Sequence, residues 1–260
     1  MLFRSSNGET TNVTSLSIGI NDANGFIGVP SGGHGYFWDS NGDGRINESD
    51  SVNDDAIGLA IRDLDVGVIV AKELRPDPNN PAQIDVGVYL AAQAHVSSIG
   101  LVGLGDDIVL QADDLQLDLN TGLRAKISGG HQDAQTGAWS YDDAGVSFDF
   151  TTIDFSKSTW KDSHQVVHQG YAIETGNPDE PIQLLYDEQM LRVFGHAVLD
   201  VFGVVHIDGS LDFRASESQG ITIFADAEAR LGTEDFGITA HVTGLLVIGE
   251  RNGKIGRAHV

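Results

Sequence analysis

A twelve-residue stretch, DSNGDGRINESD at 39–50, holds the residues of this chain whose types and spacing best suit metal binding. A calcium loop presents hard oxygen ligands at alternating positions, turns sharply at its sixth residue and closes on an acidic side chain at its twelfth. Gly44 stands at that sixth position, and Ile46, at the eighth, would tie the loop to its surroundings. The ligand positions are occupied by Asp39, Asn41, Asp43, Arg45 through its carbonyl, Asn47 and Asp50. The spacing therefore predicts a Ca²⁺ site.

This pattern resembles the EF-hand calcium loop, and especially the dockerin variant, which has Asn at the ninth position and Asp at the twelfth. The resemblance covers these twelve residues only, because neither GGHGYFW before them nor SVNDDAIGLAI after them suits a flanking helix. A dockerin also carries two such loops, and we find one, so the resemblance implies calcium and not cohesin binding. Asp50 in place of a bidentate Glu predicts an affinity of about 10⁻⁴–10⁻³ M, as in extracellular modules. The alternative is a polar turn without metal.

Other catalytic and cofactor motifs are weak in this sequence. GLVGLG at 100–105 has the wrong glycine order for a dinucleotide site, and no phosphate loop, nucleophile elbow or HExxH occurs. HQVVH places His164 and His168 four residues apart, which pairs them on a metal only in a helix. His196 and His206 are ten residues apart, too far to meet on one straight strand. We therefore interpret these histidines as surface residues and assign no catalytic residue.

Carbohydrate chemistry is left open by the acidic and aromatic residues. A glycosidase needs two carboxylates at a set separation, but 38 acidic residues give no basis for choosing a pair. The loops contain a group of aromatic residues, Trp139, Tyr141, Trp160 and Tyr171. They offer either a platform for sugar stacking or packing against a sheet, and packing is the simpler interpretation.

Composition limits the partners. The chain has 15 basic and 38 acidic residues, a formal net charge of -23, which disfavours nucleic acid and anionic membranes. Cysteine is absent, so disulfides, cysteine-based zinc sites and thiol nucleophiles are excluded. No apolar run reaches the ~20 residues of a membrane-spanning helix. The acidic balance favours cations as partners.

Alternation of apolar and polar residues dominates the chain and predicts β-structure. Apolar or small residues occupy every second position from Ile84 to Leu104 and from Val193 to Phe213. A two-residue hairpin would reverse this parity, so DG at 208–209 is not expected to be a turn. These segments are either long bent strands or strands joined by three-residue loops. We expect the alternating apolar residues to face a core.

The alternation changes phase at Arg62–Asp63 and at Asp113–Asp114, which predicts two β-bulges. One segment, DEPIQLLYDEQML at 179–191, is a helix candidate. The remaining stretches at 72–83, 129–143 and 156–180 are predicted loops. The expected fold is all-β and elongated, with mostly antiparallel sheets of long or bent strands, little helix and a repeat-like character.

Both ends of the chain look foreign. MLFRS at 1–5 and IGRAHV at 255–260 match translations of complementary strands of a sequencing adapter, so we expect residues 6–254 to be an internal piece of a longer protein. Within it we expect a β-segment with the calcium loop at 6–78, a long alternating segment at 79–128, a loop-rich segment at 129–190 and a second long alternating segment at 191–254.

The expected function is that of a structural or adhesive β-module in a large secreted or cell-surface bacterial protein, rigidified by Ca²⁺. Its expected partners are calcium, neighbouring repeats of the same chain and surface glycans. One alternative is a carbohydrate-binding or carbohydrate-degrading β-protein, such as a β-helix lyase, with Trp139 or Trp160 exposed in a groove beside carboxylates. A second alternative is a lipid-binding β-groove, which predicts a continuous concave apolar surface.

Overall fold

The computed structural model describes residues 2–4, 10–44, 46–47, 49–77, 79–105, 107–141, 145–177, 180–233, 236–251 and 254–255. The terminal residues 1, 5 and 256–260, which belong to the stretches predicted to be foreign, lie outside this part. Within the described part the chain is almost entirely strand and contains no α-helix, which confirms the predicted all-β class.

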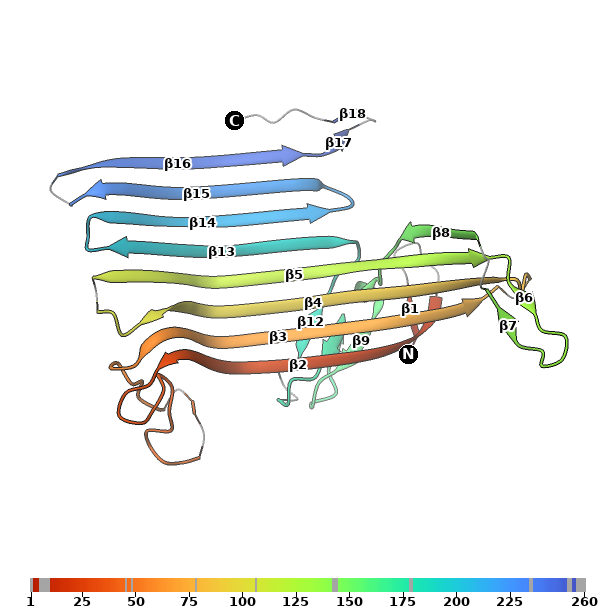
Figure 1. The fold of residues 1–260 in the computed structure, drawn as a ribbon, viewed down its shortest axis with the longest axis horizontal. Coiled ribbons are helices and arrows are strands. Elements are labelled where there is room, and N and C mark those ends of the chain that lie inside the picture. Colours follow the sequence, from red (N-terminus) through yellow and green to blue (C-terminus); the bar gives the residue numbers. More distant parts are fainter. Residues whose placement is uncertain are drawn as a thin grey trace.

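One large antiparallel sheet organises the molecule, with the order β1-β2-β3-β4-β5-β13-β14-β15-β16, and β8 pairs with β5 as a tenth strand (Figure 1). Its strands are β1 (Leu2–Arg4), β2 (Thr10–Val29), β3 (Ile57–Pro76), β4 (Gln83–Val102), β5 (Ile108–Ser128), β8 (Gly145–Phe150), β13 (Met190–Val201), β14 (Val205–Ser216), β15 (Gly220–Gly232) and β16 (Gly237–Ile248). The other elements are β6 (His131–Gln132), β7 (Trp139–Ser140), the 3₁₀ helix η1 (Phe155–Lys157), β9 (Thr159–Lys161), β10 (Val167–Gln169), β11 (Tyr171–Ile173), β12 (Ile182–Leu184), β17 (Glu250–Arg251) and β18 (Lys254–Ile255).

The two long alternating segments fold differently, one as a single strand and the other as a hairpin. The segment from Ile84 is one long strand, β4, up to Val102. The segment from Val193 folds back at residues 202–204, between β13 and β14. That three-residue connection preserves parity, and Gly209 lies inside β14 as expected.

The predicted helix at 179–191 is wrong, because its described residues form β12 and the start of β13. Their apolar residues pack in the core as strands, and this tertiary packing outweighs a weak helix propensity.

Bulges keep the apolar residues of the long strands on one side. Asp22, Asp63 and Asp114 have left-handed backbones, with φ of 54°, 49° and 50°. The register shifts beside Asp22 in the β2–β3 pairing and opposite Asp114, between Phe194 and His196 of β13. Asp tolerates this conformation better than most residues with a side chain. Both phase changes in the sequence therefore coincide with these aspartates.

A small cap, residues 151–177 and 180–189, covers part of one face of the sheet. Short strands β9–β12 of this cap lie behind β2–β5 in Figure 1. The main core lies between them and consists of Phe3, Val13, Ile69, Ala71, Tyr89, Ala91, Ile153, Phe155, Ile173, Ile182, Leu184 and Tyr186. Gly19 permits close approach, because a Cβ there would lie 2.3 Å from the carbonyl oxygen of Glu174.

Buried polar groups fix the cap and the sheet beneath it. Asn120 of β5 donates from Nδ2 to the carbonyls of Ile153 and Glu188, at 3.0 and 2.9 Å. The Tyr186 hydroxyl donates to Oδ1 of Asp118 at 2.7 Å. Because buried polar groups are costly without partners, these bonds favour a single position for the cap.

The expectation that the regularly alternating apolar residues face a core is wrong. In β3 and β4 the cap covers Ile69, Ala71, Tyr89 and Ala91, which occupy the odd positions. The even positions, among them Val70 and Val88, point to the opposite and open side, where 45% and 51% of these two residues are exposed. Side chains of neighbouring positions in a strand must alternate between faces, so covering one set leaves the other uncovered.

Candidate functional sites

The predicted calcium loop belongs to an insertion between β2 and β3, seen at the lower left of Figure 1. A second core cluster docks this insertion on the sheet. It consists of buried Tyr36, Ala56 and Ala60, with Phe26, Phe37, Val52 and Val102 packed against them. The guanidinium of Arg62 lies over the Tyr36 ring at 5.1 Å and donates a hydrogen bond to its hydroxyl. The loop is therefore held at the end of the sheet by packing of its flanks.

Asp39 organises the first half of the loop. Its Oδ1 accepts hydrogen bonds from the backbone N–H of Gly42 and Asp43, at 2.6 and 3.0 Å, and its Oδ2 accepts one from Gly44 at 2.8 Å. Gly44 has φ of 84°, which provides the sharp turn expected at the sixth position. Asn41 Oδ1 accepts from the N–H of Asp43 at 2.9 Å.

Asp50 closes the second half. Its Oδ1 accepts from the backbone N–H of Ser40 and Asn41, and its Oδ2 accepts from Asn47 N–H at 3.1 Å. The Asn47 bond, together with those from Asn41 and Ser40, lowers the pKa of Asp50 and keeps it ionised. Arg45, whose carbonyl is the predicted seventh ligand, lies outside the described residues.

The donor set fits Ca²⁺ in its chemistry, since it consists of carboxylate and amide oxygens around a glycine turn. Among the described residues, no three acidic, histidine or cysteine side chains stand close enough together to hold a metal. The carboxylates of Asp39 and Asp50 are hydrogen-bonded to the loop's own backbone. Calcium would have to compete with these bonds, which is consistent with weak affinity.

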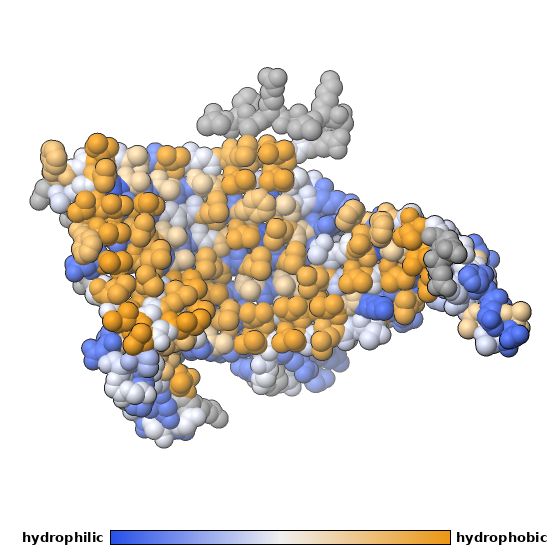
Figure 2. Space-filling model, viewed as in Figure 1, coloured by the Kyte–Doolittle hydropathy of each residue, from blue (hydrophilic) through white to orange (hydrophobic). Residues whose placement is uncertain are grey.

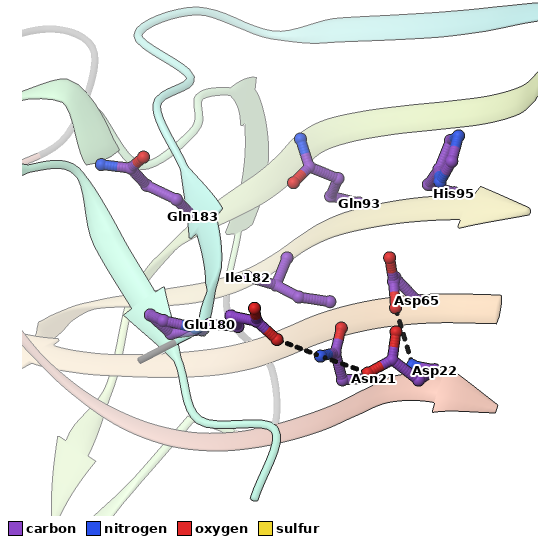
Figure 3. Close-up of a pocket in the computed structure, with 9 residues that line it drawn as sticks. Asn21, Asp22, Asp65, Gln93, His95, Glu180, Ile182 and Gln183 are labelled. Carbon is purple, nitrogen blue, oxygen red and sulfur yellow. Dashed lines mark hydrogen bonds between the residues drawn. The ribbon is translucent and has the colours of Figure 1, made fainter. Parts of the chain in front are cut away.

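A polar hollow of about 520 Å³ lies between the sheet and the cap, close to the insertion (Figure 3). Asp22 N–H donates to Oδ1 of Asp65 at 2.9 Å, and Asn21 Nδ2 donates to Oε2 of Glu180 at 3.3 Å. Gln93 and His95 of β4 line its other side. A larger hollow of about 910 Å³ shares Asp22, Asp65 and Glu180 with it and extends to the insertion. Its walls carry acidic groups that disfavour anionic ligands.

His196 and His206 are closer in space than the sequence suggested, because the turn at 202–204 sets β14 beside β13. Both line a hollow of about 380 Å³ with His241 of β16. Each imidazole is within 2.7–3.1 Å of an aspartate: Asp208, Asp200 and Asp226 respectively. The interpretation as surface histidines missed this grouping, which the parity-preserving turn could have revealed.

The loop aromatics do not meet as one platform. Trp139 is 40% exposed and stacks against Tyr141, with ring centroids 6.5 Å apart. Trp160 stacks on His168 at 4.6 Å, and Tyr171 packs against the main core. His164 and His168 lie outside any helix, and His168 Nε2 is 2.9 Å from Oδ2 of Asp162. Packing accounts for Trp160 and Tyr171.

The open face of the sheet is the largest uncommitted surface. Apolar side chains cover it from β2 to β16, and Figure 2 shows this face. Its members include Leu16, Ile18, Ile27, Val29, Val70, Val88, Leu110, Phe148, Phe150, Val193, Ile207, Leu211, Leu231, Ile238 and Val242. Ile27 is 75% exposed and Ile238 is 74% exposed. At the described positions of β2–β5, β8 and β13–β16, Lys72 is the single charged residue on this side.

Comparison of the chain with protein-family models, with curated proteins and with solved structures gives no match. The described residues contain no helix that is long and apolar enough to cross a membrane.

Proposed function

We propose that this chain is a lipid-binding β-sheet module, and that its open apolar face holds the hydrocarbon of the lipid. A single observation carries the proposal: one side of a single-layer sheet is continuous, apolar and uncovered. The lipid-binding alternative predicted a continuous concave apolar surface, and the continuous apolar character of this face favours it among the functions that the sequence left open.

The size of the face supports the need for a covering. The face spans roughly 1,300 Å². This area follows from eight strands, β2–β5 and β13–β16, spaced ~4.8 Å apart, each with at least twelve residues that rise ~3.3 Å per residue. The largest apolar patch of an ordinary monomer is about 300–600 Å². Exposure of the larger area to water is unfavourable by about 25 cal/mol per Å². Hydrocarbon chains remove this cost without needing any polar partner on the face.

The other candidate functions receive less support. A parallel β-helix lyase requires parallel coils, whereas the described strands pair antiparallel. A structural or adhesive module of a secreted or surface bacterial protein stays a prediction. Such a role is compatible with lipid binding, because the cap and the apolar face lie on opposite sides of the sheet. The capped side would stay free for contacts with other parts of that protein while the apolar face holds lipid.

The test uses phosphatidylcholine vesicles and two matched variants of β14. Ile207→Asp places a carboxylate on the apolar face, and Ser210→Asp places one on the polar face of the same strand. Vesicle flotation should recover the wild-type chain and Ser210→Asp, whereas Ile207→Asp should bind at least tenfold more weakly, because a carboxylate in hydrocarbon is strongly unfavourable. Circular dichroism confirms that both variants fold. Failure of the wild-type chain to float, or equal binding of both variants, would contradict the proposal.

We propose a second, independent property, that the loop at 39–50 binds Ca²⁺ and stiffens the insertion. The glycine turn and oxygen donors support it. Millimolar Ca²⁺ should raise the melting temperature of the wild-type chain, and Asp39→Ala/Asp43→Ala should abolish the rise. Asp54→Ala/Asp55→Ala, which removes two acids outside the loop, should retain it. A rise that survives the first double substitution would mean that calcium acts elsewhere.

A further inference from the structure

A recess opens on the apolar face at a step in the edge of β5. On this edge β13 pairs with β5 up to Asn120, and β8 pairs with it from Leu123. Thr121 and Gly122 lie between these two pairings. Figure 1 shows β8 and β13 following one another along the same edge. The step leaves a hollow of about 610 Å³, which is within the ~300–1,000 Å³ range of small-molecule sites.

The lining of this recess is mostly hydrocarbon and comes from five strands. Leu119 of β5, Phe150 of β8, Leu191 of β13, Ala215 of β14 and Ile221 of β15 all contribute. Phe150 is 73% exposed, so its ring is available to a ligand. In the sheet register, Leu119 is opposite Leu191, Ala215 is opposite Ile221, and Phe150 is opposite Leu123. These side chains therefore share the open face.

The polar groups at the recess are few and lie on one side. The side chain of Gln189 donates from Nε2 to Thr121 Oγ1 at 3.4 Å. The backbone carbonyl of Gln189 accepts a hydrogen bond from the backbone N–H of Glu217 at 3.1 Å. Glu217 is exposed beside the lining residues Ser216 and Gly220. Neither Lys nor Arg is among the described lining residues. A ligand head at this mouth would meet a carboxylate and no fixed positive charge.

We infer that this recess is a specific site for a single alkyl chain whose head is zwitterionic or cationic. The inference rests on the proposed lipid function and assigns it a place and a ligand class. The hydrocarbon lining accepts the chain, and the carboxylate of Glu217 with the net charge of -23 disfavours a fatty-acid head. A second flat sheet laid on this face would bridge the recess and leave a void, which forfeits packing contacts. A flexible chain can enter it.

The test uses lysophosphatidylcholine below its micellar concentration, with chains of ten, twelve and fourteen carbons, and calorimetry on the full chain. Each added CH₂ buried should tighten binding about fourfold. Ala215→Trp fills the recess and should weaken binding at least tenfold. Ala229→Trp, an alanine of β15 on the same face and outside the recess, should leave it unchanged.

The head-group preference is tested with myristate and Glu217→Gln. The wild-type chain should bind lysophosphatidylcholine more tightly than myristate, and Glu217→Gln should narrow that difference. Equal weakening by both tryptophan variants would overturn the recess as the site while leaving lipid binding by the whole face intact. Binding of vesicles without saturable binding of any lysolipid would overturn it in the same way. Absence of both kinds of binding would overturn the proposed function as well.

Discussion

The buried pair of Glu73 and Arg124, beneath the cap, allows a quantitative test of how the fold is held. Their side chains are 0% and 2% exposed, and Arg124 Nη2 is 3.2 Å from Glu73 Oε2. The Tyr89 hydroxyl donates to the same carboxylate oxygen at 2.6 Å. Glu73→Leu removes the carboxylate and leaves a buried guanidinium without it. Breaking one side of such a pair costs about 3–5 kcal/mol.

The double variant Glu73→Leu/Arg124→Leu should recover much of this loss. Replacing a whole buried ion pair with apolar side chains is often close to neutral. The Tyr89 hydroxyl would still lack its acceptor, which costs about 1–3 kcal/mol. We therefore expect the double variant to be about 2 kcal/mol more stable than Glu73→Leu alone, so that the two substitutions are coupled and their losses are far from additive.

Urea unfolding measures this coupling. With an m-value of about 2.5 kcal/mol/M, Glu73→Leu should lower the midpoint by about 1–2 M. Glu228→Leu, an exposed acid of β15, is the control and should change stability by less than about 0.5 kcal/mol. Additive single effects, or a loss below about 1 kcal/mol for Glu73→Leu, would refute the view that this pair is a desolvated, mutually dependent unit.

Four further expectations follow from local geometry. Burial, and the hydrogen bond to Glu73, raise the pKa of Tyr89 to about 12. The contribution of this group to stability is therefore full below pH ~10 and lost as pH rises through about 12, and Tyr89→Phe should remove a phenolate titration step near pH 12. Gly19→Ala should cost about 1–3 kcal/mol in thermal unfolding, because its Cβ would meet the cap backbone, whereas Gly244→Ala, with no atom within 4 Å of the new Cβ, should not. Asp63→Val should cost about 1–2 kcal/mol and Asp63→Gly little, since φ is 49°. Hydrogen bonds from Arg214 and Arg192 lower the pKa of Asp212, so the advantage of wild type over Asp212→Asn should be present above pH ~4 and lost as pH falls through the lowered pKa.

Local patterns in the sequence predict much of the sheet. Period-2 alternation identifies β4 and the β13–β14 pair, because side chains on a strand must alternate between faces. Parity shows that Gly209 lies inside a strand, and the phase changes at Asp63 and Asp114 coincide with left-handed residues. Helix formation at 179–191 is a wrong prediction, because a propensity over so few residues is weaker than burial of Ile182 and Leu184 in the core.

The sequence by itself also determined the composition of the calcium loop, since donor types and the glycine turn are local properties. It did not determine whether the carboxylates converge, which depends on how the loop closes on Asp39 and Asp50. It likewise determined that one side of each long strand is apolar. Only the tertiary structure decided that the cap covers the opposite side, through Asn120 and Tyr186, because both sides of β3 and β4 carry enough apolar residues to form a core. The recess beside Thr121 also depends on tertiary structure. It exists because β8 ends and β13 begins at neighbouring positions on one edge of β5, and no local sequence pattern encodes the pairing of these two distant segments with the same strand.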